Sequence, residues 1–220
     1  MSKRRPRTRH HANPLGFVRE VALPDWGQTF LRPDQPLEVD VGCDKGEFLL
    51  GRAAQAPEVN LVGLEIRAPI VDMVADRIAR QGLTNAAVVL CNANRSFEAL
   101  FAPGALSAVY VHFPDPWFKA RHRKRRLVTP AFVEAVAARL RPGGLFEVMT
   151  DFEPYAREVV PLVEGHGAFE NPAGPGAPAA PEPGRVLTHR EAWHESRGDP
   201  IHRYRWRRRP AAASAPAGLL

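Results

Sequence analysis

Five short apolar runs between residues 36 and 150 are typical of buried β-strands. They are PLEVDV at 36–41, NLVGLE at 60–65, AAVVLC at 86–91, SAVYVHF at 107–113 and GLFEVMT at 144–150. Most of their residues are β-branched, aromatic or otherwise apolar, and such side chains pack well on a pleated surface. The runs therefore predict five strands.

The segments between these runs have the apolar spacing of amphipathic helices. One helix runs from about Arg67 to Gln81 and is stopped by Gly82; its buried face is formed by Ile70, Val71, Val74 and Ile78. A second helix follows Pro130 and ends at the breaker 142–144; its inward side chains are Phe132, Val133, Val136 and Leu140. Strand and helix therefore alternate along the chain.

This alternation requires right-handed crossovers and a parallel sheet that is covered on both faces. We predict a doubly wound α/β domain at residues 14–209, which is most of the 220-residue chain. Three segments lack the pattern: a basic N-terminal arm at 1–13, a Pro/Gly/Ala-rich loop at 171–184 and a C-terminal tail at 210–220. We expect all three to be flexible.

The chain is basic, with 30 lysines and arginines against 24 acidic residues and a formal net charge of +6. Clustered basic residues favour a polyanionic partner, although arginine enrichment can also reflect a biased genome. No apolar run approaches the ~18 residues of a membrane span, and the N-terminus does not resemble a secretory signal. Cys43 and Cys91 are too few for a disulfide scaffold. A cytoplasmic protein without a membrane partner is expected.

Polar residues stand at the ends of the first three predicted strands, where ligands bind in such sheets. Asp40, Gly42 and Gly46 follow the first strand, and the glycines let the backbone turn sharply and approach a ligand. Glu65 ends the second strand and could accept hydrogen bonds from both hydroxyls of a ribose. Asn92 follows the third and could reach an adenine edge. These strand ends predict a nucleoside-binding cleft.

The spacing of the first turn distinguishes between nucleotide cofactors. A dinucleotide pyrophosphate needs G-x-G-x-x-G, whereas Gly42 and Gly46 have between them Asp44, whose carboxylate would repel it. Asp40 can instead pair with an ammonium group. S-adenosylmethionine combines adenine, ribose, a sulfonium and an amino acid, and fits this set. For the glycines alone, a tight turn without a ligand is the alternative.

The fourth predicted strand leads into the most distinctive segment, FPDPWFKARHRKRR at 113–126. Pro114 and Pro116 restrict the residues before them, which predicts that Asp115 lies on a stiff, extended segment. Six cations follow within eight residues: Lys119, Arg121, Arg123, Lys124, Arg125 and Arg126. Beside a cleft, such a run favours a phosphate backbone. The alternative is a solvated face, with Asp115 in a turn and Trp117 in the core.

Five motifs together make the chain similar to the tRNA (guanine-N7)-methyltransferase family. They are DxGxxxGxFL at 40–49, GLE at 63–65, CNA at 91–93, FPDPWFKARHRKRRLV at 113–128 and TDFEPY at 150–155. They occur in the family's order over about residues 36–207. The resemblance implies a Rossmann-like class I enzyme that moves a methyl group from S-adenosylmethionine to N7 of a variable-loop guanosine of tRNA, guanosine 46.

The resemblance also implies roles for individual residues. It places in the cofactor site Asp40, Gly42, Gly46, Glu65, Asn92, Ala93 and Asp115, and it makes Asp115 catalytic as well. It places against the substrate Lys119, Asp151 and the T-x-x-E element Thr188, His189, Arg190 and Glu191. It implies tRNA as the partner and no metal ion, and it leaves open whether the protein is a monomer or a homodimer.

Three features depart from the family pattern or complicate it. Asp44 replaces the usual middle glycine of the first motif, which could narrow the cofactor pocket or change how the methionine end is held. Glu38 is a second acid near Asp40, although the spacing to the glycines favours Asp40. The loop at 171–184 lengthens the connection to the T-x-x-E element.

The chemistry agrees with the resemblance. Guanine N7 has an exposed lone pair, so a direct in-line attack on the sulfonium methyl needs no cysteine nucleophile. Asp115 and Asp151 could stabilise the positive charge that passes to the purine and accept hydrogen bonds from its N1 and N2 edge. The eight histidines show no zinc pattern. The competing classes are a nicotinamide-dependent oxidoreductase and a non-catalytic RNA-binding module.

Overall fold

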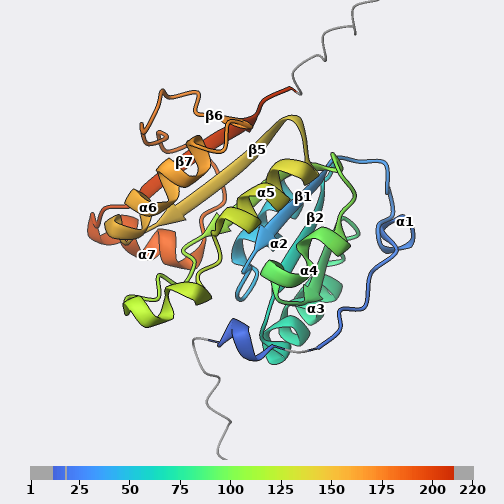
Figure 1. Ribbon diagram of the computed structural model, residues 1–220. Coiled ribbons are helices and arrows are strands. Elements are labelled where there is room, and N and C mark those ends of the chain that lie inside the picture. Colours follow the sequence, from blue (N-terminus) through green and yellow to red (C-terminus); the bar gives the residue numbers. More distant parts are fainter. Residues whose placement is uncertain (1–11, 18, 211–220) are drawn as a thin grey trace, which may run out of the picture.

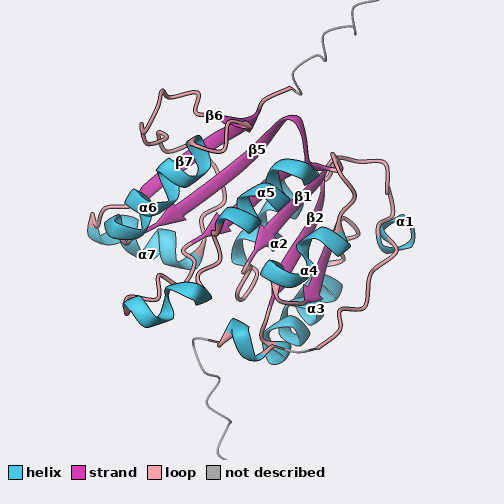
Figure 2. Ribbon diagram, in the orientation of Figure 1, coloured by secondary structure: helices cyan, strands magenta, loops and turns pink. Residues whose placement is uncertain are grey.

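A seven-stranded mixed sheet forms the middle of the molecule, with the strand order β3-β2-β1-β4-β5-β7-β6 (Figure 1). The computed structural model describes residues 12–17 and 19–210. Most of the expected N-terminal arm, residues 1–11, and nearly all of the expected C-terminal tail, residues 211–220, lie outside the described residues. Helices cover both faces of the sheet (Figure 2). The prediction of a doubly wound α/β domain is confirmed.

All five predicted strands are present and run parallel to one another. They are β1 Leu37–Val41, β2 Asn60–Glu65, β3 Ala86–Leu90, β4 Leu106–His112 and β5 Leu140–Thr150. Two further strands, β6 Phe169–Glu170 and β7 His202–Arg208, complete the sheet, and β7 runs antiparallel to β5 and β6. The sheet is therefore mostly parallel, with an antiparallel strand near one edge.

The helices follow the strands in the predicted order. They are α1 Trp26–Thr29, α2 Glu47–Gln55, α3 Ala68–Gln81, α4 Ala93–Leu100, α5 Pro130–Arg139, α6 Glu153–Glu164 and α7 His189–Arg197, with the 3₁₀ helices η1 Pro14–Gly16 and η2 Ala120–Arg125. Helix α3 lies where it was predicted, and Gly82 ends it in the left-handed conformation, φ 63°. Of its expected buried face, Ile70 and Val74 are buried, whereas Val71 and Ile78 are only half-buried. Within the described residues, every helix is too short or too polar to cross a membrane.

Helix α5 ends earlier than its prediction. Its last residue is Arg139, and Leu140 begins β5 instead of ending the helical face. The expected breaker at 142–144 lies inside β5, where the pairing shifts from Leu106 opposite Leu140 to Ala108 opposite Leu145. The strand bulges outward there, and a bulge is a place where a sheet tolerates glycine and proline. Leu140 is buried all the same.

The central strands have one apolar face and one polar face. The apolar core beneath α4, α5 and α6 includes Val39, Val41, Val109, Val111, Phe146 and Val148. The alternate positions carry polar side chains that are also buried, namely Glu38, Asp40, Tyr110, His112 and Glu147. Successive side chains of a strand point to opposite faces, so these residues form one polar layer across β1, β4 and β5. Phe48 of α2 packs against Tyr110 and His112 on this side.

Strand β7 is the main element that the sequence-based prediction missed. Its sequence HRYRWRR alternates aromatic residues with arginines, and such alternation is typical of a strand. The strand was not predicted because the segment contains so many arginines. Trp206 is completely buried, with its ring 5.8 Å from that of Phe146. On the other face, Arg205 contacts Glu147 of the polar layer and Arg203 contacts Glu191 of α7.

The Pro/Gly/Ala-rich loop at 171–184 contains no helix or strand, as its composition predicts. Hydrogen bonds nevertheless connect it to the domain at several points. Asn171 donates to the carbonyl of Ala177 at 2.9 Å, and the backbone N–H of Ala179 donates to the carbonyl of Arg203 at 2.8 Å. The flexibility of this loop stays a prediction.

Candidate active site

The carboxyl ends of the parallel strands lie along one edge of the sheet (Figure 1). The strand order reverses between β1 and β4, and in doubly wound sheets the ligand crevice lies outside this switch point. The predicted site residues follow the strands at this edge: Asp40 and Gly42 at β1, Glu65 at β2, Asn92 at β3, Asp115 after β4 and Asp151 after β5. The topology thus brings together residues that are more than one hundred positions apart.

The two glycines of the first turn have different structural roles. Both adopt positive φ, 79° for Gly42 and 76° for Gly46. A Cβ on Gly42 would meet no atom within 4 Å, so the backbone at this position is open to a ligand. A Cβ on Gly46 would lie 3.1 Å from Val74 of α3, so this glycine is needed for helix packing. Gly42 is therefore the better candidate for a direct cofactor contact.

Asp40 is a buried carboxylate near the end of β1, just before the first turn, and is only 3% exposed. Burial raises its pKa to about 6; nearby His112 lowers it, while the carboxylates of Glu65, Asp44 and Glu47 raise it further. Ionisation of the buried Asp40 carboxylate is therefore costly in the free protein, and a cation bound beside it would relieve that cost. The ammonium and sulfonium of S-adenosylmethionine fit this requirement, whereas a pyrophosphate does not.

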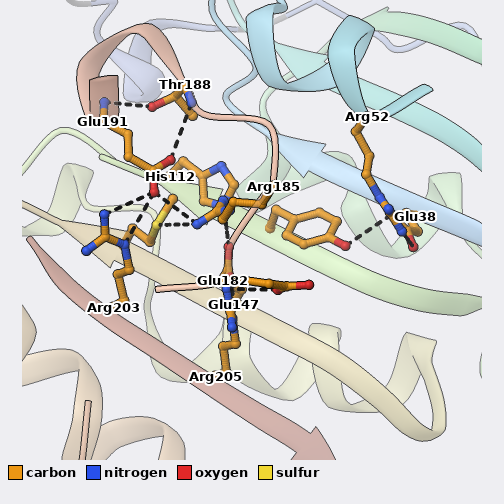
Figure 3. Close-up of polar contacts among 12 residues, drawn as sticks. Glu38, Arg52, His112, Glu147, Glu182, Arg185, Thr188, Glu191, Arg203 and Arg205 are labelled. Atoms are coloured by element: carbon orange, nitrogen blue, oxygen red, sulfur yellow. Dashed lines mark hydrogen bonds and ion pairs between the residues drawn. The ribbon is translucent and has the colours of Figure 1, made fainter. Parts of the chain in front are cut away.

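Glu38, the alternative to Asp40, is held within the fold. Its carboxylate accepts hydrogen bonds from Arg52 at 2.9 and 3.0 Å and from the hydroxyl of Tyr110 at 3.0 Å (Figure 3). These contacts join α2 to β1 and β4, away from the first turn. The geometry therefore favours Asp40 as the candidate cofactor carboxylate.

Glu65 is oriented by Arg67, which the sequence-based prediction missed. The Glu65 carboxylate accepts from the backbone N–H groups of Ile66 at 2.7 Å and Arg67 at 2.9 Å, and from the Arg67 guanidinium at 2.9 and 3.0 Å. The same guanidinium contacts Asp44 at 2.5 Å. Asp44 adopts φ 45° and is half exposed, so its carboxylate turns outward to Arg67. Arg67 thus connects the ends of β1 and β2.

Asn92 and Ala93 form the start of α4. The Asn92 side chain caps the helix by accepting from the N–H of Asn94 at 3.1 Å, and it donates to the carbonyl of Pro14 at 2.8 Å. Ala93 is the first residue of α4, and the N–H groups of a first turn have no partner within the helix. If the Asn92 amide bound adenine, it would have to give up its hydrogen bond to the carbonyl of Pro14. The backbone N–H of Ala93 has no acceptor within the helix and would give up no such bond.

The segment between Phe113 and Trp117 is fixed by its two ends. Phe113 adopts φ 49° and Trp117 φ 46°, both in the left-handed region that is costly for aromatic residues. The predicted extended conformation is thus wrong at Phe113, whose backbone N–H donates to the carbonyl of Met149 at 2.8 Å. The Arg190 guanidinium lies 5.7 Å and the His194 ring 5.9 Å from the ring of Phe113. Asp115, between the two prolines, is partly exposed at the edge of the sheet.

The basic run divides into buried and exposed parts. Arg126 is only 6% exposed, donates to the carbonyl of Pro116 at 2.7 Å and pairs with Glu158, so it supports the fold and is not available to a phosphate. Arg125 packs over the ring of Trp117 at 4.9 Å. The remaining four cations are exposed: Lys119, Arg121, Arg123 and Lys124. They form the candidate phosphate-binding surface.

Glu147 is the centre of a buried ionic network that the sequence did not indicate (Figure 3). It accepts hydrogen bonds from His112 at 2.8 Å, from Arg185 at 3.3 Å and from Arg205. Burial alone would raise the pKa of Glu147, but these partners lower it to about 2. The network joins β4, β5 and β7 behind the candidate site.

The T-x-x-E element is the N-terminal cap of α7. The Thr188 hydroxyl accepts from the N–H of Glu191 at 3.0 Å, and the Glu191 carboxylate reaches back to the N–H of Thr188. Glu191 is 0% exposed and also accepts from Arg185 at 3.0 Å and Arg203 at 3.2 Å. A direct substrate contact by Glu191 would require α7 to move, whereas His189 and Arg190 are exposed.

Asp151 follows β5 and is linked to α7. Its Oδ2 atom lies 2.6 Å from Arg190 Nη2 and 3.2 Å from His194 Nε2. Burial raises the pKa of Asp151, but the hydrogen bond and charge of Arg190 more than offset this and lower it below its usual value. Asp151 is therefore ionised at neutral pH.

The described residues contain no group of three or more histidine, cysteine or acidic side chains arranged to hold a metal ion. Cys43 and Cys91 are both buried and unpaired. Burial raises the pKa of the Cys91 thiol to about 12 and that of Cys43 well above its usual value. The thiolate is the nucleophilic form of cysteine, and both thiols stay protonated at neutral pH, so neither acts as a nucleophile.

Comparisons with known proteins agree with this arrangement. Residues 34–204 match a family described as putative methyltransferase. Over 204 residues the chain is 39% identical to the tRNA (guanine-N(7)-)-methyltransferase of Thermosynechococcus vestitus, covering 92% of this chain and 95% of the relative. Over 218 residues it is 39% identical to the protein of the same name from Parasynechococcus marenigrum, covering 96% and 92%.

Solved structures of low sequence identity share the fold. The 16S rRNA methyltransferase KamB aligns with a TM-score of 0.59 at 16% identity, covering 86% of this chain and 95% of KamB. The aminoglycoside resistance methyltransferase NpmB1 aligns with a TM-score of 0.52 at 18% identity, covering 83% and 90%. These similarities show that the chain shares the arrangement of sheet and helices of these solved structures.

Proposed function

Because the chain belongs to the tRNA (guanine-N7)-methyltransferase family, whose methyl donor is S-adenosylmethionine, we propose that it modifies guanosine 46 in the variable loop of tRNA. The observation that carries the proposal is the position of Asp115 and Asp151 at two neighbouring strand ends. They lie along the same edge as the acidic first turn and the exposed cations that follow β4.

The acidic first turn would hold the cofactor. Asp40 would pair with the ammonium of the methionine end, and the open backbone at Gly42 would lie against it. Glu65, held in place by Arg67, would accept hydrogen bonds from the ribose. S-adenosylmethionine supplies an electrophilic methyl group when it is bound. The N–H of Ala93, with Asn92 beside it, would bind the adenine edge.

Asp115 and Asp151 would hold the guanine. Carboxylates accept hydrogen bonds from the N1 and N2 edge of guanine and leave N7, on the opposite edge, directed at the methyl group. N7 carries a lone pair and no proton, so this chain needs no general base. The purine gains a positive charge during the transfer, and two preorganised carboxylates stabilise that charge. This makes Asp115 the principal candidate catalytic residue.

The exposed cations and α7 would hold the tRNA backbone. Lys119 is the residue before η2 and begins the segment 119–126, which we call the η2 loop. His189 and Arg190 are exposed on α7. Thr188 and Glu191, which the family resemblance assigns to the substrate, would act indirectly by fixing the start of α7. We also propose a cytoplasmic location, because both cysteines are unpaired, as is usual in a reducing compartment.

A labelling experiment tests the site of methylation. The protein is incubated with unmodified tRNA and methyl-labelled S-adenosylmethionine, and the nucleosides are analysed. A methyl group on N7 labilises the glycosidic bond, so reduction and aniline treatment should cut the tRNA at position 46. A tRNA with adenosine at that position should not be cut. A methyl group on a ribose or an exocyclic amine, or retention of tRNA without turnover, would contradict the proposal.

The exposed cations of the η2 loop should determine how tRNA binding depends on salt. Replacing Arg121 and Lys124 together by glutamine should weaken tRNA binding and reduce the slope of log affinity against log salt by roughly one to two units, because fewer counterions are released from the phosphates. Filter binding at several salt concentrations measures this slope.

Two matched arginines provide the control for this experiment. Arg32 and Arg141 are also exposed, but they lie near the amino-terminal ends of the parallel strands, opposite the candidate site. Arg32 precedes β1 and Arg141 is near the start of β5. Their replacement by glutamine should leave the slope close to that of the unmodified protein. Equal slopes for both double variants would mean that the η2 loop is only a solvated surface.

A further inference from the structure

Helix α7 contacts two parts of the candidate active site with one face. Arg190 and His194 are four residues apart and therefore neighbours on the helix surface. Both contact the carboxylate of Asp151, at 2.6 and 3.2 Å, and both lie on the ring of Phe113, at 5.7 and 5.9 Å. Phe113 is two residues before Asp115. The same helix face thus meets both candidate guanine-binding segments.

His194 lies between two carboxylates. Its Nε2 is 3.2 Å from Asp151 Oδ2, and its Nδ1 is 3.3 Å from Asp199 Oδ2, just after α7. Its imidazole is nearly parallel to the ring of Phe113, at 18°, and Trp193 packs edge-on against it at 4.7 Å. The ring therefore has a neighbour on each side that restricts its rotation.

The two basic partners of Asp151 differ in rigidity. The Arg190 side chain is 47% exposed, and exposed ion pairs are screened by water and contribute little to orientation. The His194 side chain is 9% exposed, and its Nε2 is buried without a hydrogen bond of good angle among the described residues. Burial makes such a nitrogen bind firmly to any acceptor that aligns with it. Asp151 is the carboxylate beside it.

We propose that His194 is a positioning residue for methyl transfer. Its Nε2 lies 3.2 Å from Asp151 Oδ2 without a hydrogen bond in the described part of the free protein and would align with that carboxylate in the substrate complex, while its ring stacks on Phe113 and its Nδ1 contacts Asp199. Arg190 and His194 both contact Oδ2 of Asp151, so in this proposal the guanine hydrogen bond is accepted by Oδ1. Through Phe113, the same ring stabilises the left-handed turn that leads to Asp115. This role rests on the proposed function, because Asp115 and Asp151 are the guanine contacts in question.

Two substitutions separate the polar contact from the stacking. His194→Phe keeps a ring against Phe113 but removes both nitrogen contacts, whereas His194→Gln keeps a donor near the position of Nε2 but removes the ring. We expect His194→Phe to lower kcat by roughly 10-fold or more, because a small displacement of a reacting contact has a large effect on rate. The KM for tRNA and the affinity for S-adenosylmethionine should stay within about two-fold. His194→Gln should restore a large part of kcat.

His166 offers a matched control. It pairs with Glu134 at 2.8 Å and packs near Phe169 at 5.8 Å. It follows the C-terminal end of α6, about 18 Å along that helix from the end that lies near Asp151. His166→Phe should leave kcat unchanged. Melting temperatures of all variants should be measured alongside the kinetics, so that a loss of folded protein is recognised.

The outcomes distinguish this inference from the proposed function. If the unmodified protein methylates N7 and His194→Phe retains kcat within two-fold, the positioning role is wrong and the proposed function stands. If His194→Phe and His194→Gln lose kcat equally, and in step with their melting temperatures, His194 only supports the fold. If the unmodified protein does not methylate N7, the proposed function fails whatever the variants do, and the positioning role fails with it.

Discussion

Replacing Asp115 by asparagine is expected to lower kcat for tRNA methylation by about 10²-fold or more, with little change in the melting temperature. Asp115 lies between Pro114 and Pro116, and Phe113 and Trp117 on either side adopt left-handed conformations, so the backbone that carries the carboxylate is restricted. Asparagine has almost the same shape but no charge. It can still accept a hydrogen bond from guanine but cannot balance the positive charge that develops on the purine.

Single-turnover kinetics with saturating tRNA and S-adenosylmethionine measures this effect on the methyl-transfer step. Asp34→Asn is a suitable control, because Asp34 is exposed in the turn before β1, at the amino edge of the sheet. A rate for Asp115→Asn within a few-fold of the unmodified protein would exclude a catalytic role and leave Asp115 as a turn residue.

Replacing Asp40 by asparagine should have opposite effects on cofactor binding and on stability. The pKa of Asp40 is about 6 in the folded protein, against an unperturbed value of 3.8. A raised carboxyl pKa means that the protonated form contributes stability below pH 3.8, and that this stability is lost as the pH rises through 6. At pH 8 the ionised carboxylate therefore destabilises the free protein by about 1–3 kcal/mol.

Asparagine removes this cost, so Asp40→Asn should raise the melting temperature of the free protein at pH 8. The same change removes the partner of the cofactor's ammonium and should weaken S-adenosylmethionine binding by about 1–3 kcal/mol. In the unmodified protein, binding should weaken as the pH falls below about 6, because protonated Asp40 no longer attracts a cation.

Titration calorimetry at pH 8 and pH 5.5, combined with thermal unfolding, tests both effects. Asp76→Asn serves as the control, because Asp76 is exposed on α3. Unchanged cofactor affinity in Asp40→Asn would remove Asp40 from the site. A lower melting temperature would show that its carboxylate is paired in solution.

The sequence by itself determined the order and type of most elements. The five parallel strands and α3 were predictable because their apolar spacing is a local property of each segment. The positions of Asp40, Glu65, Asn92, Asp115 and Asp151 also followed, because the carboxyl ends of parallel strands meet at one edge. Motif spacing was sufficient to indicate the family, since those motifs lie at the same strand ends.

The tertiary structure decided which charges are paired and which are free to bind a ligand. Arg126 and Lys124 are equivalent in the basic run, yet Arg126 is buried against Glu158 and Lys124 is exposed. Strand β7 was not predicted because its arginines suggested an exposed segment. In the structure, two of these arginines pair with Glu147 and Glu191, which lie on other elements. The spacing of residues along the sequence indicates which face of its own helix or strand a residue occupies. The residue with which it pairs depends on which helices and strands become neighbours when the sheet forms.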